Sequence, residues 1–355
     1  MKISKGLLFV FGRVLSPLYG MIMRKREAWY RSGVMESTEL EVPVISVGNL
    51  TMGGTGKTPM VIHIARQLQK AGLKPAIISR GYKGKARQPV NIVSDGSNIL
   101  LAADQAGDEP RLMAEALPGV VVVTGVQRAA AAAFAVEKFG VNVIVLDDGF
   151  QHMALGRDLD LVLFKAPDFL GNGRVFPGGD LREPSAALNR AGAFIITGGG
   201  KETEKATAEF KSYLEENFPG KKVFEAGYKF QGLTDKDGEP FSGGISGLKF
   251  YCFSGIAEPG GFLRTVSEAG ISPYGFKVFK DHHLYNADDL ADLAAEAGKY
   301  NCDALLTTEK DMVKIRELHG VLPLYALQIE LELSEPLNDL LPLTKESRVS
   351  DLKQV

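Results

Sequence analysis

Continuously apolar runs alternate with segments of helical periodicity from Val42 to about Gly200. In the helical segments, apolar residues recur every three or four positions, whereas the shorter runs are rich in Val and Ile and are typical of buried strands. Strands are predicted at 43–48, 75–79, 90–94, 120–124, 143–147, 160–164 and 193–197, and helices at 57–71, 107–117, 127–139 and 201–216. This alternation predicts a doubly wound α/β fold, in which a mostly parallel sheet binds ligands at the carboxyl ends of its strands.

A second α/β set lies between two isolated strand-like runs at 223–233 and 324–333. Its predicted elements are strands at 249–254, 275–279 and 303–307 and helices near 260–269 and at 287–299. Because the chain leaves and returns through two strands, we expect a smaller domain on a two-stranded hinge. The predicted division is an N-terminal segment 1–35, a core domain 36–220, hinge strands within 221–245 and 322–335, and a small domain 246–321.

The first 31 residues combine basic charge with an apolar helical stripe. This segment contains seven Lys and Arg residues but only one acid, Glu27, and apolar residues recur between the basic ones at helical spacing. Arg13 and Pro17 interrupt this run, so it is too broken to predict a membrane span, and it lacks a signal-peptide cleavage site. A basic amphipathic segment of this kind is predicted to lie in the interface of an anionic leaflet. The alternative is a helix packed on the protein with its basic residues solvated.

The stretch from Val42 to Ile64, VPVISVGNLTMGGTGKTPMVIHI, has the strand, glycine loop and helix of a P-loop. In such a loop, backbone N–H groups wrap the β-phosphate, the lysine (here Lys57) reaches the β/γ oxygens, and the hydroxyl of Thr58 holds Mg²⁺. The match is imperfect because Thr51 stands where the usual pattern has glycine. The motif predicts nucleoside triphosphate binding, and the alternative is a glycine-rich turn without a ligand.

Composition narrows the function classes. Hydrophobic content of 45% and charged content of 24% describe an ordinary globular protein, and a net charge of −2 argues against a general nucleic-acid binder. The two cysteines, Cys252 and Cys302, lie in apolar runs. We interpret them as buried thiols of a protein from a reducing compartment.

Two acidic motifs follow or precede predicted elements of the core. Asp147 and Asp148 end a buried strand downstream of the P-loop, where an acid usually serves the Mg²⁺ side of the site. Adjacent residues of a strand point in opposite directions, so we expect different tasks for the two acids. Asp108, in Asp108-Glu109-Pro110, is either the N-cap of the following helix or a carboxylate that accepts a proton from a substrate hydroxyl.

Three further motifs lie at predicted strand ends or loops. His282 follows Asp281 in KDHH, which is compatible either with an oriented base or with a solvated turn. The glycine-rich and proline-rich stretch 171–184 carries Arg174 and Arg182, which suit phosphate recognition. The motif TTEKD at 307–311 provides a helix cap at Thr308, and its spacing assigns it no chemistry.

Taken together, these motifs resemble a known family. GNLTMGGTGKTP, SRGYKG, GDEP, LDDGFQH, GNGRVFPGGDLREP, FSGIAEP, FKDHH and TTEKD occur in the order seen in tetraacyldisaccharide 4′-kinases of lipid A biosynthesis, and the resemblance covers nearly the whole chain. It implies a P-loop kinase that transfers the γ-phosphate of ATP to the 4′-hydroxyl of tetraacyldisaccharide 1-phosphate. It also implies a peripheral or monotopic location at the cytoplasmic face of the bacterial inner membrane, with the N-terminal segment on the anionic inner leaflet.

The resemblance also implies roles for individual residues. Asp108 is similar to the family's catalytic carboxylate, paired across the cleft with His282. Lys57 and Arg182 would neutralise phosphate charge, Arg182 as the domains close. Glu109, Asp147 and Asp148 are similar to the family's acids around the metal and the γ-phosphate. The implied Mg²⁺ ligands are Thr58, Glu109 and Asp147. How the metal and phosphate roles are divided among the three acids is left open. The implied nucleotide pocket is lined by Thr51, Met52, Gly53, Gly54, Thr55, Gly56, Lys57, Thr58, Gln151 and His152.

Two other functions are compatible with parts of the sequence. GGTGKT also resembles the loop of membrane-partitioning ATPases, but that group has a lysine where this chain has Met52, and it offers no role for His282. A P-loop kinase for a soluble sugar or nucleoside would leave the basic amphipathic N-terminus unexplained.

Overall fold

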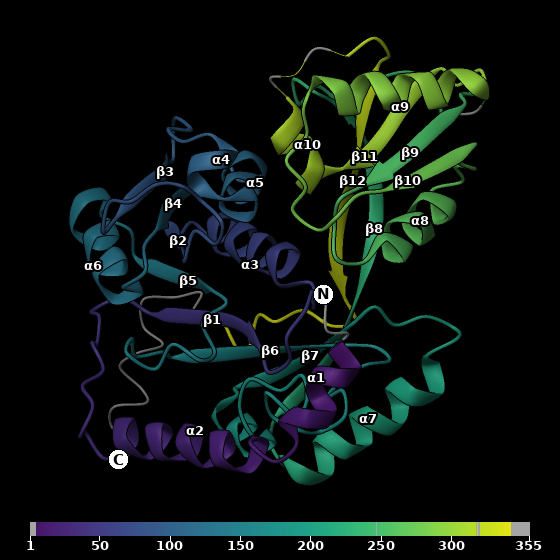
Figure 1. Cartoon of the computed structure of the whole chain (residues 1–355). Coiled ribbons are helices and arrows are strands. Elements are labelled where there is room, and N and C mark those ends of the chain that lie inside the picture. Colours follow the sequence, from purple (N-terminus) through teal and green to yellow (C-terminus); the bar gives the residue numbers. More distant parts are fainter. Residues whose placement is uncertain (1–4, 246, 317, 319, 342–355) are drawn as a thin grey trace.

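A computed structural model describes residues 5–341 except 246, 317 and 319. Its strands are β1 Val44–Asn49, β2 Pro75–Ser79, β3 Asn91–Asp95, β4 Val121–Thr124, β5 Val143–Asp147, β6 Leu159–Lys165, β7 Ala193–Thr197, β8 Lys222–Asp235, β9 Phe250–Ser254, β10 Gly275–Val278, β11 Ala304–Thr308 and β12 Leu324–Leu333. Its helices are α1 Lys5–Gly12, α2 Ser16–Arg31, α3 Lys57–Lys70, α4 Ala103–Ala106, α5 Asp108–Ala116, α6 Arg128–Phe139, α7 Glu204–Asn217, α8 Pro259–Glu268, α9 Ala287–Lys299 and α10 Glu309–Ile315, with a 3₁₀ helix η1 at Ser185–Arg190. The described strands form one twelve-stranded sheet in the order β10-β9-β11-β12-β8-β7-β6-β1-β5-β2-β4-β3 (Figure 1).

The core half of the molecule comprises β1–β7 with α3–α7. Strands β7, β6, β1, β5, β2 and β4 run parallel, and β3 joins the edge antiparallel. Helices α3 and α5 pack on the face that carries Ile45 and Val47, whereas α6 and α7 cover the opposite face. Burial on both faces explains why β1, β2 and β5 are continuously apolar in sequence. The prediction of a doubly wound, mostly parallel sheet is confirmed.

The small half comprises β9–β11 with α8–α10. Helix α8 packs against Phe250 and Cys252 on one face of this part of the sheet, and α9 packs against Tyr251 and Phe253 on the other. Both cysteines are buried free thiols, as expected.

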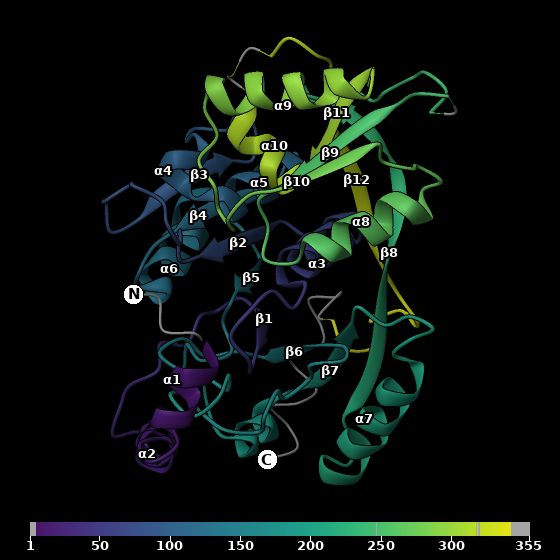
Figure 2. The ribbon, with the colours of Figure 1, turned by 45° about the vertical axis from the view of Figure 1, so that its right-hand side comes forward.

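The long antiparallel strands β8 and β12 connect the two halves (Figure 2). The first residues of β8 pair with β7 of the core half, and the first residues of β12 pair with β11 of the small half. The ladder between β8 and β12 is irregular between Gln328 and Ile329, where Gly232 is the partner of Gln328. One continuous sheet therefore passes from one half to the other through a two-stranded segment.

Element boundaries differ from the predictions at two helices. The helix expected at 201–216 begins at Glu204, after the Gly198–Gly200 run. The helix expected at 107–117 is α5, and the short helix α4 that precedes it was not predicted. Gly107 separates them because its φ of 94° lies outside the helical range and is accessible mainly to glycine.

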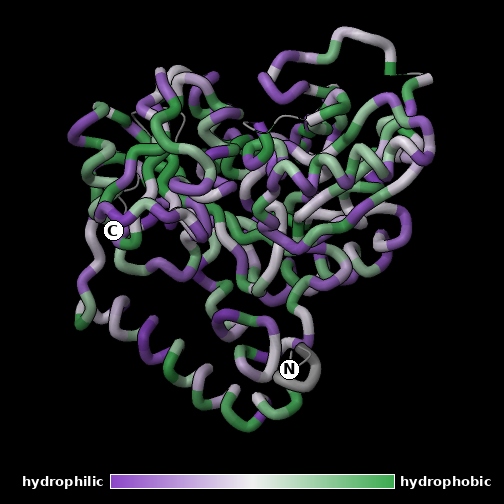
Figure 3. Tube along the Cα trace, turned by 45° about the horizontal axis from the view of Figure 1, so that its top comes forward, coloured by the Kyte–Doolittle hydropathy of each residue, from purple (hydrophilic) through white to green (hydrophobic). Residues whose placement is uncertain are grey.

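The N-terminal helices α1 and α2 lie on the glycine-rich loop 171–184. The hydroxyl of Ser16 donates to the carbonyl of Val175 at 2.7 Å, and Gly20 approaches the side chains of Val175 and Pro184. Figure 3 shows hydrophobic positions interspersed with hydrophilic ones along α2. Apolar side chains that remain exposed in α1, α2 and the turn between them are Val10, Phe11, Val14, Leu15, Leu18, Met21 and Ile22. Within the described part of the chain, each helix is too short or too polar to cross a bilayer.

Candidate active site

A cleft of about 840 Å³ opens between the carboxyl ends of the core strands and the small half. The core half contributes the loop 52–58, Ser79, Asp147 and Asp148 to its wall. The small half contributes His282, Lys310 and residues of α8. The cleft lies at the strand ends, where a ligand site is predicted.

The P-loop connects β1 to α3 and lies on the floor of this cleft. Gly56 has a φ of 82°, and a Cβ at this position would lie 2.5 Å from the hydroxyl of Tyr228, so glycine is required there. The first part of the loop is fixed by the 171–184 loop, since Thr51 bridges to Leu181 and the N–H of Met52 donates to the carbonyl of Asp180 at 2.8 Å.

Lys57 stands at the start of α3, and its ammonium group is held by two acceptors. Its Nζ lies 3.3 Å from Oδ1 of Asn49 and 3.5 Å from Oδ1 of Asp148. The hydroxyl of Thr55 is buried and has no hydrogen-bond partner in the described part of the chain. Lys57 is therefore positioned over the loop, beside an acid that it neutralises.

The adjacent acids Asp147 and Asp148 have opposite surroundings, as expected. Asp147 is buried at the end of β5, where Ser79 donates to its Oδ2 at 2.7 Å and its Oδ1 lacks a partner among the described residues. Burial, together with the charges of Glu109 and Asp148, raises the pKa of Asp147 to about 7.

Asp148 begins a turn, with a φ of 51°, and accepts from Nη1 of Arg182 at 2.8 and 2.9 Å. Burial by itself raises the pKa of Asp148, but the charges of Lys57 and Arg182 outweigh it and hold the pKa below its usual value. Arg182 thus belongs to the core half and is already paired.

Gln151 and His152 lie behind the cleft and not on its wall. The side-chain amide of Gln151 donates to the carbonyl of Asn49 at 3.0 Å, and its oxygen accepts from Arg182 at 3.3 Å. Nδ1 of His152 lies 3.2 Å from Nη1 of Arg128. Burial and the charge of Arg128 lower the pKa of His152 to about 4, so it is neutral near pH 7. The expectation that these two side chains line the pocket is corrected: Gln151 contacts Arg182, which does line it, whereas His152 contacts Arg128, which does not.

Asp108 and His282 meet across the two halves. Nδ1 of His282 lies 2.9 Å from Oδ2 of Asp108, and both side chains are largely buried. Asp108 makes no capping bond; it is the first residue of α5, and Gly107 occupies the N-cap position. Burial by itself raises the pKa of Asp108, but the bond to His282 and the charge of Lys314 outweigh it and hold the pKa below its usual value. The solvated-turn interpretation of His282 and the N-cap interpretation of Asp108 are both wrong.

His282 is held in a strained conformation. Its φ of 59° is unusual for a residue with a side chain, and its N–H donates to the carbonyl of Gly255 at 3.0 Å. Such a conformation aims Nδ1 of the imidazole at Asp108, while Nε2 lies 3.7 Å from Oδ2 of Asp281. His282 lines the cleft and Asp108 does not.

Further charged pairs join α5 to α10, and the sequence alone did not indicate them. Lys310 donates to Oε1 of Glu109 at 2.7 Å, and Arg316 lies 2.8 Å from Oε2 of Glu115. Thr308 caps α10 by accepting from the N–H of Asp311, as expected. Both interhelical pairs span 201 positions in the sequence, so no local pattern could reveal them.

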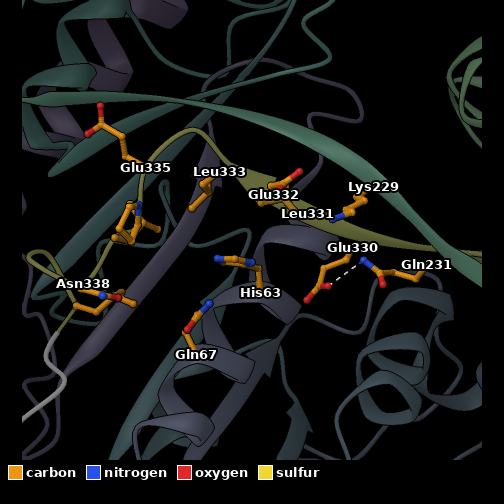
Figure 4. Close-up of a pocket in the computed structure, with 13 residues that line it drawn as sticks. His63, Gln67, Lys229, Gln231, Glu330, Leu331, Glu332, Leu333, Glu335 and Asn338 are labelled. Carbon is orange, nitrogen blue, oxygen red and sulfur yellow. Dashed lines mark hydrogen bonds between the residues drawn. The ribbon is translucent and has the colours of Figure 1, made fainter. Parts of the chain in front are cut away.

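A smaller hollow of about 360 Å³ lies between α3 and the strands β8 and β12 (Figure 4). His63 and Gln67 of α3 face it, and Glu330 accepts from Gln231 at 3.1 Å on its wall. Glu330 also pairs with Arg66 at 3.2 Å. These contacts tie α3, the P-loop helix, to the two connecting strands.

Comparison with known proteins places the chain in a family. Residues 8–344 match the family described as tetraacyldisaccharide-1-P 4′-kinase. The chain belongs to this family. It is 46% identical over 338 residues to the tetraacyldisaccharide 4′-kinase of Desulfotalea psychrophila, with 95% of this chain and 97% of that protein covered. It is 39% identical to the protein of the same name from Desulfatibacillum aliphaticivorans, over 91% of this chain and 88% of the relative.

A solved structure has the same fold. The crystal structure of LpxK from Aquifex aeolicus in complex with ATP superposes with a TM-score of 0.72 at 34% identity, covering 96% of both chains. The chain is accordingly an ATP-dependent kinase that phosphorylates the 4′-hydroxyl of tetraacyldisaccharide 1-phosphate. The resemblance seen in the motifs is confirmed.

Proposed function

We propose that His282 is the general base of the kinase reaction and that Asp108 orients it. The observation that carries this proposal is the 2.9 Å contact between Nδ1 of His282 and Oδ2 of Asp108, with His282 on the cleft wall and Asp108 behind it. An ionised Asp108 holds the proton on Nδ1, which leaves Nε2 able to accept the proton of the sugar hydroxyl. The deprotonated oxygen forms a bond to the γ-phosphorus as the bond to the β-phosphate oxygen breaks, and ADP leaves with that electron pair.

Charge neutralisation in this proposal comes from Lys57 and Arg182. Lys57 reaches the β- and γ-phosphate oxygens from the start of α3, and Arg182 is held beside the P-loop by Asp148. Since Arg182 lies in the core half, it contacts phosphate without needing the small half to move. This replaces the expectation that domain closure delivers it.

Mg²⁺ fits the residues around Asp147. Oδ1 of Asp147 is buried and has no hydrogen-bond partner among the described residues, so it would be available as an oxygen ligand of Mg²⁺. Thr58 offers a hydroxyl at the start of α3. Glu109 is close enough to influence the pKa of Asp147. Among the described residues, no three His, Cys, Asp or Glu side chains form a metal site by themselves, which agrees with the use of one or two carboxylates plus substrate phosphates for Mg²⁺. When bound with ATP, Mg²⁺ neutralises charge on the phosphoryl oxygens.

We also propose that β8 and β12 act as the hinge of a small domain at 246–321 on a core at 36–220. Support comes from the irregular ladder at Gln328 and Ile329 and from the separate apolar clusters of the two halves. Closure would exclude water from the cleft and limit wasteful ATP hydrolysis. Small-angle scattering with and without ATP tests this proposal, and an unchanged radius of gyration would contradict it.

The N-terminal helices are proposed to dock on the anionic inner leaflet of the bacterial inner membrane, at its cytoplasmic face. Their exposed apolar side chains, such as Phe11 and Val14 at 73% and 84% exposure, accompany the basic residues of α2. A surface of this composition binds anionic lipid interfaces, where the acylated substrate resides.

The activity is tested by transfer of label from γ-labelled ATP to a tetraacylated disaccharide 1-phosphate in detergent micelles. Lys57→Ala provides the blank, because loss of the P-loop lysine removes phosphate binding. Labelled lipid that disappears in the blank is the expected result. Phosphate release without labelled lipid would favour an ATPase switch, and transfer to a soluble sugar instead would identify a different acceptor.

A further inference from the structure

The motif TTEKD places Lys310 on the wall of the cleft from the side of the small half. Its side chain is 20% exposed, and its Nζ lies 2.7 Å from Oε1 of Glu109. Among the described residues of the small half, two basic side chains line the cleft, Lys310 and Arg264. Arg264 is exposed to solvent. Lys310 is therefore the shielded cation that this half presents to the cleft.

The partner of Lys310 fixes where this cation lies. Glu109 follows Asp108 directly in α5, so Lys310 lies beside the Asp108–His282 pair. Glu109 also lines the cleft together with Asp147 and the P-loop. Lys310 thus lies in the cleft that holds both the proposed base and the proposed phosphate site.

The surroundings of Lys310 suit a cation. A lysine side chain is ordinarily protonated at neutral pH, and Lys310 donates to the Glu109 carboxylate at 2.7 Å. A protonated lysine in a shielded cleft interacts strongly with any anion that enters, because little water screens it.

We propose that Lys310 is a catalytic residue that contacts the transferring γ-phosphoryl group, and that its pair with Glu109 is its position before the nucleotide enters. The proposal rests on the proposed function of His282 and Lys57. Charge on the γ-phosphoryl oxygens must be neutralised during transfer, and Lys310, which already reaches Glu109 of the core half at 2.7 Å, is placed in the cleft to supply this. When Glu109 turns toward the phosphate site, Lys310 loses its 2.7 Å partner and becomes free to contact the γ-phosphoryl group.

The chain offers a matched control for this proposal. Arg316 lies at the end of α10 and pairs with Glu115 of α5, so it joins the same two helices, but neither residue lines the cleft. If Lys310 merely held the two halves together, Lys310→Met and Arg316→Met would have similar effects. Glu115 keeps a partner in Arg316→Met because Arg111 donates to it at 2.7 Å.

The experiment measures lipid phosphorylation, residual ATP hydrolysis and binding of ADP with aluminium fluoride, a mimic of the transferring phosphoryl group. Lys310→Met should lower kcat for both reactions by about 10²–10³-fold, the usual effect of losing one donor to a developing charge. It should weaken the aluminium fluoride complex by a similar factor and change the KM for lipid by less than about threefold. Lys310→Arg should restore part of the loss, and Arg316→Met should keep kcat within about threefold of the wild type.

Each contrary result has a distinct meaning. Equal losses in Lys310→Met and Arg316→Met would overturn the proposal in favour of a structural clamp. A raised KM for lipid with unchanged kcat would overturn it in favour of acceptor binding. If the wild type itself labels no lipid, the proposed function fails; if the wild type labels lipid and Lys310→Met does so equally well, the role of Lys310 fails alone.

Discussion

The contact between Asp108 and His282 predicts that the two residues act as one unit. Asp108→Asn keeps the shape of the side chain but removes the negative charge that stabilises the imidazolium formed when His282 accepts the proton. The variant should fold, because Lys314 retains Asp311 as a partner at 2.8 Å. We expect kcat to fall by about 10²–10⁴-fold, the usual range for losing a general base.

The size of the effect follows from the geometry. A 10³-fold loss corresponds to about 4 kcal/mol of transition-state stabilisation. His282→Gln removes the same base directly, so its loss should be of the same order. Asp108 acts through His282, which it contacts at 2.9 Å. The kcat of the double variant should therefore be no lower than that of the less active single variant. The coupling energy between the two substitutions should then equal about the free-energy loss of one single substitution.

The assay is label transfer to the lipid at saturating substrates, together with ATP binding measured separately. His283→Gln is the matched control, since Nε2 of His283 pairs with Asp289 at 2.9 Å within the small half and plays no part in the cleft. It should keep kcat within about threefold of the wild type. If the two losses in kcat multiply in the double variant, to about 10⁶-fold, the conclusion that Asp108 and His282 act as one unit would be refuted. A large loss of ATP binding in Asp108→Asn would instead assign Asp108 to the phosphate or metal site.

Three further predictions concern stability, metal and membrane. Burial raises the pKa of Glu309 from the usual 4.5 to about 7, so the folded chain keeps a proton that the unfolded chain loses. Relative to Glu309→Gln, the wild type should therefore lose up to about 3 kcal/mol of unfolding free energy as pH rises from 5 to 8. Urea denaturation measures this loss, and parallel pH profiles of the two proteins would contradict it. Asp147→Asn should raise the Mg²⁺ concentration needed for half-maximal binding of ATP by about 10–100-fold, whereas an unchanged titration would remove Asp147 from the metal site. Met21→Glu should weaken binding to anionic vesicles, measured by co-sedimentation, by about tenfold, because an apolar side chain would no longer enter the interface. Val321→Glu changes an exposed apolar position outside the N-terminal helices and should bind like the wild type.

Local patterns were sufficient for the elements and for the phosphate loop. Runs such as β5 are apolar because both faces of a parallel strand are buried, and the glycine loop before Lys57 has a backbone requirement that few other residues meet. The position of Asp147 and Asp148 at a strand end was equally visible. Their opposite surroundings followed from the alternation of side chains and from the turn at Asp148.

The catalytic pairing was beyond what spacing could decide. Asp108 was compatible with a helix cap and His282 with a turn, and family resemblance was needed to join them. TTEKD was assigned no chemistry, because the partner of Lys310 belongs to another half of the molecule. Gln151 and His152 were expected on the pocket wall, but the turn after Asp148 places them behind it.

The sequence by itself determined which segments become strands, which loop has the glycine pattern of a P-loop and which residues carry charge at strand ends. Each of these depends on interactions between near neighbours in the chain. Only the tertiary structure decided that Asp108 faces His282 and that Glu109 faces Lys310, contacts that span 174 and 201 positions. The physical reason is that these contacts depend on how β8 and β12 orient one half of the sheet against the other, and that orientation is set by packing across the whole molecule.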